Sequence, residues 1–382
     1  MDFANPFMVA SAPPARTAEM IKRAFAAGWG GAVTKSISLE PAADLQPRLR
    51  ALRYQNNPIG MENIELSTTW TIEDWQREIC EVKSAYPDRP LWASIMETPI
   101  KKNWQRLAEV IQETGVDALE LNVSCPHGMP SKGMGAFIGQ NAELTGNVVA
   151  WVKEVAKVPI VVKLTPNVTD ITYIALAAKE HGADALCAVN TISGMIGVDL
   201  DTLTPLPAVG GVSTYGGYSG PGIKPIALRC VSQIAKATGL PVSGMGGLTT
   251  WENAVEFMAV GAGTVQIGTA VMWHGYGIIN NLIQGLRHYL TGKNLANVTS
   301  IVGAALSKIV EFPEMPLTAR VQAEVNATCN GCLRCVTACA DGGFQAISGA
   351  EGQRVRIDAR KCDGCGLCAL VCPQSSITMV PR

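Results

Sequence analysis

Eight of the twelve cysteines in this 382-residue chain lie between residues 329 and 372, in two runs with the same spacing. The runs are Cys329-x2-Cys332-x2-Cys335-x3-Cys339 and Cys362-x2-Cys365-x2-Cys368-x3-Cys372-Pro373. Thiolates hold the iron of iron–sulfur clusters, and in a duplicated run of this kind the fourth cysteine of each run ligates the cluster of the other. The array therefore predicts two 4Fe–4S clusters and an electron-transfer role for this part of the chain.

The spacing also predicts which cysteines share a cluster. The expected sets are Cys329, Cys332, Cys335 and Cys372 for one cluster, and Cys362, Cys365, Cys368 and Cys339 for the other. Zinc is the alternative, but zinc modules usually combine paired C-x2-C knuckles rather than triplets with a trailing cysteine. The pattern is that of a bacterial two-cluster ferredoxin, with Ala340 in place of the usual proline after Cys339.

A further cysteine, Cys125, lies in the segment LELNVSCPHGMPSKGMG. Pro126 and the glycines predict a loop after a strand, where a thiol can reach a ligand and exchange a proton. The three other cysteines, Cys80, Cys187 and Cys230, lie in periodic apolar surroundings and are expected to be core thiols.

The elements that would position these groups follow a regular alternation. Eight short β-rich runs each precede a stretch with helical spacing, and they span residues 6–11, 31–36, 91–96, 118–124, 159–165, 185–191, 241–247 and 264–270. This order predicts an α/β fold, a (β/α)8 TIM barrel. A doubly wound open sheet is the alternative, but the glycine fingerprint of a dinucleotide-binding turn is not seen in the sequence.

In such a barrel the functional residues gather at the carboxyl ends of the strands. Polar residues and glycines accumulate there, namely Ser11, Lys35, Ser36, Asn122 to Cys125, Lys163, Asn190, Thr191, Gly246, Gly247, Gly268 and Thr269. An enclosed lysine requires a carboxylate, a phosphate or an electron-rich cofactor beside it. The glycine-rich ends of the last two strands, GMGG (244–247) and IGT (267–269), predict a phosphate-bearing cofactor.

Composition limits the remaining possibilities. The 31 basic and 32 acidic residues nearly cancel, so no nucleic acid is expected as a partner. Residues 257–286 contain no charged side chain, but glycines and asparagines interrupt them, so no membrane segment is expected. The N-terminus shows no basic segment of a secretory signal, which favours a cytoplasmic protein.

The expected domains are a barrel at 1–292, a linker and packing segment at 293–325 and a ferredoxin-like domain at 326–382.

Several motifs resemble one family closely. The chain contains NPFMVAS, TKS, ENIEL, NVSCPHGM, KLTPNVTDI, NTISG, TYGGYSGPGIKPIALR and GMGG. Together with the cysteine array they resemble dihydropyrimidine dehydrogenases over essentially the whole chain, and in architecture the catalytic (PreA-type) subunit of the bacterial NAD-dependent enzyme. The resemblance implies a dihydroorotate dehydrogenase-like, FMN-binding barrel that reduces uracil or thymine to the 5,6-dihydropyrimidine, reversibly.

The resemblance also implies roles for particular residues. Cys125 corresponds to the acid/base that exchanges a proton with C5 of the pyrimidine, while FMN exchanges a hydride with C6. The residues matching the pyrimidine ligands are Asn63, Asn122, Asn190 and Thr191, with Ser124 beside them. Amides supply both a donor and an acceptor, which suits the edge of a neutral uracil. The residues matching the FMN ligands are Ser11, Lys35, Ser36, Lys163, Gly220, Met245, Gly246, Gly247, Gly268 and Thr269.

The same resemblance implies a partner subunit. An FAD- and NADH-binding flavoprotein (PreT-type) would deliver electrons through the two clusters, so the chain would use NADH indirectly and form a hetero-oligomer. Two alternatives remain. Dihydroorotate dehydrogenases share the N-x-S-C-P loop, although an asparagine commonly stands there where this chain has His127. A non-catalytic electron-transfer subunit is the other alternative, and the presence of Cys125 and the asparagines argues against it.

Overall fold

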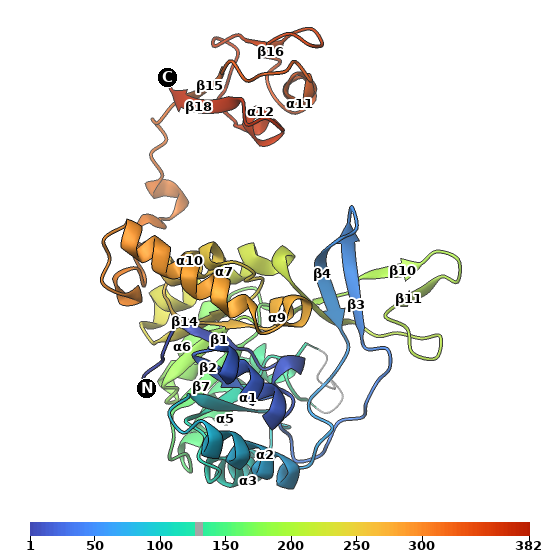
Figure 1. Ribbon diagram of the computed structural model, residues 1–382, viewed down its shortest axis with the longest axis vertical. Coiled ribbons are helices and arrows are strands. Elements are labelled where there is room, and N and C mark those ends of the chain that lie inside the picture. Colours follow the sequence, from blue (N-terminus) through green and yellow to red (C-terminus); the bar gives the residue numbers. More distant parts are fainter. Residues whose placement is uncertain (127–132) are drawn as a thin grey trace. The chain divides into compact units, whose positions relative to one another are not determined.

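The computed structural model describes residues 1–126 and 133–382, and these form two units. The first unit comprises Met1–Lys308 and the second Ile309–Arg382 (Figure 1). The units are connected through a stretch whose regular structure consists of short 3₁₀ turns, η5 (Leu306–Lys308) and η6 (Phe312–Glu314). No described helix is long and apolar enough to cross a membrane.

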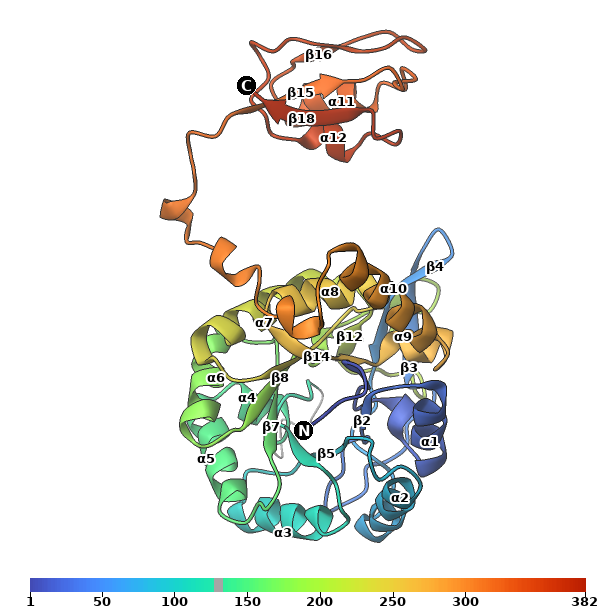
Figure 2. The same cartoon turned by 60° about the vertical axis from the view of Figure 1, so that its left-hand side comes forward.

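The first unit is built on a closed parallel barrel. Its strands are β1 (Phe7–Val9), β2 (Gly31–Val33), β5 (Leu91–Ile95), β6 (Ala118–Asn122), β7 (Ile160–Leu164), β8 (Ala185–Ala188), β13 (Val242–Met245) and β14 (Ala262–Ile267). Strand β1 pairs in parallel with both β2 and β14, which closes the ring seen in Figure 2. The predicted TIM barrel is thus confirmed, and each barrel strand falls on one of the eight predicted runs.

Helices surround the barrel on its outer side (Figure 2). They are α1 (Ala18–Ala27), α2 (Ile72–Ala85), α3 (Lys101–Gln112), α5 (Ala142–Lys153), α6 (Ile171–Glu180), α7 (Lys224–Thr238), α8 (Trp251–Ala259) and α10 (Ile278–Gly292), with the short α4 (Ala136–Gly139) and α9 (Thr269–His274) between them. Local sequence sets several boundaries: Thr71 and Asp74 form a capping box that begins α2. Gly239 ends α7 in the left-handed conformation.

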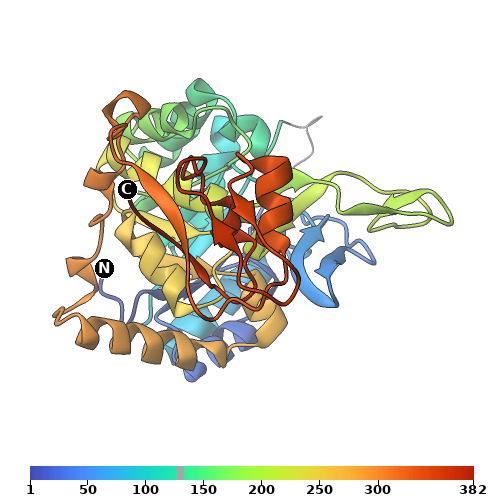
Figure 3. The same ribbon diagram turned by 90° about the horizontal axis from the view of Figure 1, so that it is seen from above.

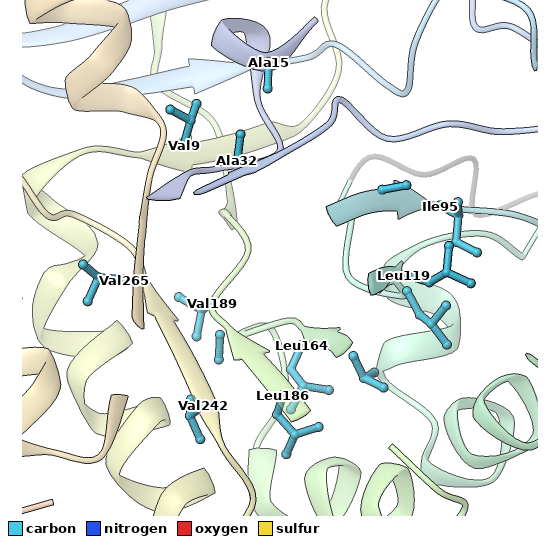
Figure 4. Packing of buried hydrophobic residues seen from close by; sticks show 14 of the residues in the cluster. Val9, Ala15, Ala32, Ile95, Leu119, Leu164, Leu186, Val189, Val242 and Val265 are labelled. Atoms are coloured by element: carbon cyan, nitrogen blue, oxygen red, sulfur yellow. The ribbon is translucent and has the colours of Figure 1, made fainter. Parts of the chain in front are cut away.

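Side chains alternate between the two faces of the barrel strands. Outward residues such as Val9, Leu119 and Leu186 belong to the large apolar core between strands and helices (Figure 4). Inward residues form a separate, smaller cluster that includes Met8, Trp92, Val161, Cys187 and Met245. The period of two along a strand explains this separation. Polar residues that share the inward parity therefore lie inside the barrel.

Two further β structures were not among the eight predicted runs. A four-stranded sheet has the order β3 (Leu49–Tyr54), β4 (Asn57–Asn63), β12 (Gly216–Ser219) and β9 (Ile192–Gly194), and β10 (Gly197–Asp199) pairs with β11 (Thr204–Leu206). The β3–β4 and β10–β11 hairpins extend away from the barrel (Figures 1 and 3). These strands lie in loops of the barrel, and β4 and β12 bring Asn63 and Ser219 to its mouth.

The second unit is a small duplicated fold. Strand β15 (Val321–Val325) pairs antiparallel with β18 (Ile377–Pro381), and β16 (Ile347–Ser348) pairs with β17 (Arg356–Ile357). Helix α11 (Arg334–Gly342) contains Cys335 and Cys339 of the first run, and helix α12 (Leu367–Leu370) contains Cys368 of the second. The small core combines apolar residues with cysteines, as expected of a unit that depends on metal clusters for its stability.

Candidate active site

A hollow of about 1000 Å³, open to solvent, lies at the carboxyl ends of the barrel strands. Its lining contains fifteen of the sixteen residues that the sequence assigned to catalysis, pyrimidine or FMN: Ser11, Lys35, Ser36, Asn63, Asn122, Cys125, Lys163, Asn190, Thr191, Gly220, Met245, Gly246, Gly247, Gly268 and Thr269. The sixteenth, Ser124, is fully buried behind the lining. Residues from both ends of the barrel sequence are thereby brought to one pocket.

Three of the expected pyrimidine ligands form one hydrogen-bonded group. Asn190 Nδ2 donates to Ser124 Oγ at 2.9 Å and to Asn122 Oδ1 at 3.2 Å. Ser124 Oγ also donates to Asn122 Oδ1 at 2.9 Å. The group joins the ends of β6 and β8, and its atoms are neutral donors and acceptors. Ser124 therefore supports the asparagines from behind.

The group continues toward the residues expected at the cofactor. Asn122 Nδ2 donates to Ser36 Oγ at 2.8 Å, and Ser36 Oγ lies 3.0 Å from Ser94 Oγ and 3.3 Å from Ser11 Oγ. Ser94 was not predicted, but it has the inward parity of β5 and is fully buried. These hydroxyls connect the expected pyrimidine ligands with the expected FMN ligands.

Asn63 and Thr191 are each held by a residue close in the chain, and Thr191 is held by Asn167 as well. Asn63 Oδ1 accepts a hydrogen bond from the main-chain N–H of Glu65. Thr191 N–H donates to Asn190 Oδ1 at 2.8 Å, and the Thr191 carbonyl accepts from Asn167 Nδ2 at 3.1 Å. Asn167 was not singled out in the sequence, although it lies in the KLTPNVTDI motif. Its part is to hold the segment that presents Thr191.

Cys125 lines the same pocket and is 7% exposed. Its carbonyl accepts a hydrogen bond from Ala136 N–H at 2.9 Å, so the start of α4 packs against the cysteine. Gly135 is required at this contact, because a Cβ there would lie 2.5 Å from the Cys125 carbonyl oxygen. His127, which the sequence comparison singled out, lies outside the described residues.

Lys35 belongs to a network of charges around the buried carboxylate of Glu65. Glu65 Oε1 lies 2.6 Å from Lys35 Nζ, while its Oε2 lies 3.1 Å from Arg16 Nη2 and 2.5 Å from Arg48 Nε. Burial alone would raise the pKa of the Glu65 carboxyl, but Lys35, Arg16 and Arg48 more than offset burial, so the pKa is lowered. No local pattern predicts these partners of Lys35, because they lie in other segments of the chain.

Lys163 also faces a buried carboxylate. Its Nζ lies 3.6 Å from Glu120 Oε1, and both side chains are almost completely buried inside the barrel. The separation exceeds a normal hydrogen bond, so Lys163 keeps donors for a ligand of the pocket. Glu65 and Glu120 thus provide part of the negative charge that was expected beside the two enclosed lysines.

The glycine-rich strand ends form an open cradle of main-chain groups. Gly246 and Gly247 have φ of 118° and 79°, and a Cβ on Gly247 would lie 2.8 Å from the Lys224 nitrogen. Within the described residues, the N–H groups of Gly246, Gly247, Gly268 and Thr269 donate to no other main-chain carbonyl. Unpaired N–H groups that face a pocket are suitable donors for a phosphate. The residues present therefore fit a phosphate-bearing flavin.

The cysteine runs border two hollows in the second unit. A hollow of about 290 Å³ is lined by Cys329, Cys332, Cys335 and Cys372, and one of about 340 Å³ by Cys362, Cys365, Cys368 and Cys339. Each combines a triplet with the fourth cysteine of the other run. Among the described residues, no three His, Cys, Asp or Glu side chains are arranged around a single metal ion. Each hollow therefore suits a group larger than a single ion, and its four cysteines are the ligands that a 4Fe–4S cluster requires.

Main-chain N–H groups also point at cysteine sulfurs in this unit. Ser376 N–H donates to Cys372 Sγ at 3.2 Å, and Ala346 N–H donates to Cys339 Sγ at 3.3 Å. Hydrogen bonds of this kind stabilise thiolates and influence the potential of a cluster.

The remaining cysteines differ from one another. Cys230 is fully buried, as expected, but Cys80 is exposed and is not a core thiol. Its position on α2 is at the edge of the apolar face, where helical spacing does not distinguish buried from exposed residues. Cys187 is buried, but its Sγ donates to Glu120 Oε2 at 3.2 Å and so has a polar neighbour.

A barrel with this pocket, joined to a unit with two cluster sites, defines an iron–sulfur oxidoreductase. Residues 1–290 match the dihydroorotate dehydrogenase family, and residues 323–379 match the 4Fe–4S dicluster domain. The chain belongs to the dihydroorotate dehydrogenase family, and within it to the PreA-type subunits of NAD-dependent dihydropyrimidine dehydrogenase. The family implies a flavin, and the dicluster domain implies two 4Fe–4S clusters.

Three relatives support this placement. The chain is 38% identical to the NAD-dependent dihydropyrimidine dehydrogenase subunit PreA of Escherichia coli (strain K12), over 99% of this chain and 93% of the relative. It is 40% identical to the chloroplastic dihydropyrimidine dehydrogenase (NADP(+)) of Arabidopsis thaliana, over 79% of this chain and 74% of the relative. It is also 40% identical to the catalytic subunit of dihydroorotate dehydrogenase B (NAD(+)) of Pyrococcus abyssi, over 80% of this chain and 96% of the relative.

Proposed function

We propose that the chain is the catalytic subunit of an NAD-dependent dihydropyrimidine dehydrogenase, which interconverts uracil or thymine and the 5,6-dihydropyrimidine. The observation that carries this proposal is the neutral hydrogen-bonded group of Asn122, Ser124 and Asn190: both asparagines line the pocket together with Cys125, and Ser124 supports them from behind. Its amides and hydroxyls match the alternating C=O and N–H edge of an uncharged pyrimidine.

In this proposal the residues of the chain divide the work. The asparagines and Thr191 hold the ring, with Asn63 approaching from β4. The Cys125 thiol delivers a proton to C5 and takes it back in the reverse direction. FMN supplies the hydride for C6 when it is bound. Two separate donors let the proton and the hydride reach adjacent carbons.

The expected FMN residues form the rest of the pocket. The N–H groups at Gly246, Gly247, Gly268 and Thr269 would hold the phosphate. Lys163 and Lys35 would place positive charge beside the ring system, although Glu65 and Glu120 offset part of it. The two carboxylates also affect which substrate the pocket suits. Both lysines of the described lining already face a carboxylate of the protein, so neither is free to pair fully with a carboxylate of the substrate. A neutral pyrimidine fits this lining better than orotate, which carries a carboxylate.

The clusters give the chain a route for electrons from outside. An FAD- and NADH-binding flavoprotein is the partner we propose, because the relatives carry names that specify NAD and a subunit. NADH alone should leave the flavin of the purified chain oxidised, and adding the partner should reduce it. Rapid reduction of the flavin by NADH without the partner would contradict this assignment.

The substrate can be tested without the partner. The flavin of the purified holoprotein is reduced with dithionite, excess reductant is removed without oxygen, and uracil, thymine or orotate is added. We expect uracil or thymine to reoxidise the flavin with stoichiometric formation of the dihydropyrimidine. Reoxidation by orotate and by neither neutral base would show a dihydroorotate dehydrogenase instead. Failure of all three would support a subunit that only transfers electrons.

A further inference from the structure

A layer of polar residues lies inside the barrel, at and beneath the lining of the pocket, and Cys187 belongs both to this layer and to the inward cluster. Its members have the inward parity of their strands, and register places them beside one another: Lys163 of β7 is opposite Cys187 of β8, and Cys187 is opposite Ser243 of β13. Glu120 of β6 and Gln266 of β14 complete the layer. Barrel interiors are usually filled by apolar side chains, so this layer is costly unless its members pair.

The members of the layer do pair, and Glu120 is at their centre. Its Oε2 accepts from Cys187 Sγ at 3.2 Å and lies 3.5 Å from Gln266 Nε2. Its Oε1 faces Lys163 Nζ at 3.6 Å. Gln266 Nε2 also donates to Ser243 Oγ at 3.3 Å. Lys163 and Gln266 line the pocket, whereas Glu120 and Cys187 lie beneath it.

Cys187 acts as a donor in this arrangement. Burial raises the pKa of its thiol well above the usual value, and the negative charge of Glu120 raises the pKa further. A thiol that keeps its proton can share it with the carboxylate in a hydrogen bond. This bond draws negative charge of Glu120 toward Oε2 and away from the atom that faces Lys163.

We propose that Cys187 and Glu120 are positioning residues, which fix Lys163 from beneath and set how much positive charge it presents to the flavin. The proposal rests on the flavin of the proposed function but not on the identity of the substrate. Neither residue lines the pocket, so each acts through Lys163. The quantity they control is the reduction potential of the bound flavin, because the reduced ring carries more negative charge than the oxidised ring.

The direction of each effect follows from charge. Glu120→Gln removes the negative partner of Lys163, so the flavin potential becomes more positive. Cys187→Ala removes a donor from the carboxylate, which then offsets the ammonium more strongly, so the potential becomes more negative. Cys187→Ser keeps a donor of similar size and restores the parent potential. Cys230→Ala removes another fully buried thiol, on α7, and leaves the potential unchanged.

The experiment is an anaerobic redox titration of the full holoprotein, with the flavin band followed against a reference dye. Flavin content and near-ultraviolet circular dichroism identify the variants that are folded and loaded. The cluster potentials serve as an internal reference, because their ligands lie in the other unit. Opposite shifts for Glu120→Gln and Cys187→Ala, with Cys187→Ser restoring the parent value, support the proposal.

Two outcomes overturn it. One is a flavin potential that stays at the parent value in both loaded variants, and the other is a shift of the same sign in both. If Glu120→Gln does not fold, the comparison of Cys187→Ala with Cys187→Ser and Cys230→Ala decides alone. These results are independent of the substrate test, because the titration requires no pyrimidine. A protein that binds flavin but reduces neither uracil nor thymine would refute the proposed function and still test this inference.

Discussion

Lys35 Nζ lies 2.6 Å from Glu65 Oε1, and both side chains are only 6 to 7% exposed. The pair joins β2, whose carboxyl end carries Lys35, to the segment that follows β4. Two arginines approach the other carboxylate oxygen. One carboxylate therefore holds three cations at the edge of the pocket, and the structure there depends on its charge.

Replacing Glu65 with glutamine should destabilise the barrel. The buried Lys35 and the partly buried Arg16 and Arg48 would then face no carboxylate, which costs about 3 kcal/mol. The urea midpoint of the tryptophan fluorescence transition of the full chain measures this effect near neutral pH. Glu81→Gln is the matched control, because Glu81 also lies 2.6 Å from a lysine but on the surface. It should change the midpoint little, and an equal loss in both variants would contradict the prediction.

The same pair predicts a dependence on pH. The pKa of Glu65 is lowered in the folded chain from a value of 4.5, so its contribution to stability is complete above that value. The contribution is lost as the pH falls through the lower folded pKa. The parent should therefore lose stability in acid more steeply than Glu65→Gln. If the curves of unfolding free energy against pH were parallel for the two proteins, Glu65 would contribute nothing to the loss of stability in acid.

Removing the Cys125 thiol should abolish most pyrimidine turnover. Without an acid at C5 we expect a loss of roughly 100- to 10,000-fold in kcat for Cys125→Ala. The flavin and cluster spectra should not change, because Cys125 is neither among the expected FMN ligands nor one of the cysteines that border the cluster hollows. Cys230→Ala, a buried thiol outside the pocket, is the control and should retain turnover. Normal turnover by Cys125→Ala would mean that another group delivers the proton to C5 of the pyrimidine.

Substituting Gly247 should weaken flavin binding. Alanine there would be strained at φ of 79°, and its Cβ would lie 2.8 Å from the main-chain nitrogen of Lys224. The backbone of the cradle must then shift, and we expect flavin affinity to fall by roughly tenfold or more. Gly239→Ala has a similar φ of 65° but open space around the Cβ. It should lower stability while retaining flavin, as measured by the flavin-to-protein ratio after dialysis.

The exchange of cysteines between the two runs can be tested by spectroscopy. Cys372→Ala and Cys335→Ala should perturb the same cluster, because both cysteines border the smaller hollow. Cys339→Ala should perturb the other one. Electron paramagnetic resonance of the reduced chain distinguishes the two clusters. If Cys372→Ala and Cys368→Ala affected one and the same cluster, each run would hold its own cluster without exchange.

Much of the architecture could be read from local patterns. Strand runs such as 118–124 and 159–165 are recognisable because they are short, β-rich and followed by helical spacing. The β3–β4 and β10–β11 hairpins were missed because they interrupt this alternation within loops of the barrel. Likewise, Cys80 was assigned to the core because periodicity fixes a helix face but not where that face ends.

The sequence by itself determined the types of group and their order: eight cysteines in two runs, a thiol after the fourth predicted strand, and glycines at the last two strand ends. These are local features, and their meaning depends on neighbours a few residues away. Only the tertiary structure decided that Glu65 meets Arg16 and Arg48, and that Glu120 meets Cys187 and Gln266. Those partners are far apart in the chain, and closure of the barrel together with strand register brings them into contact.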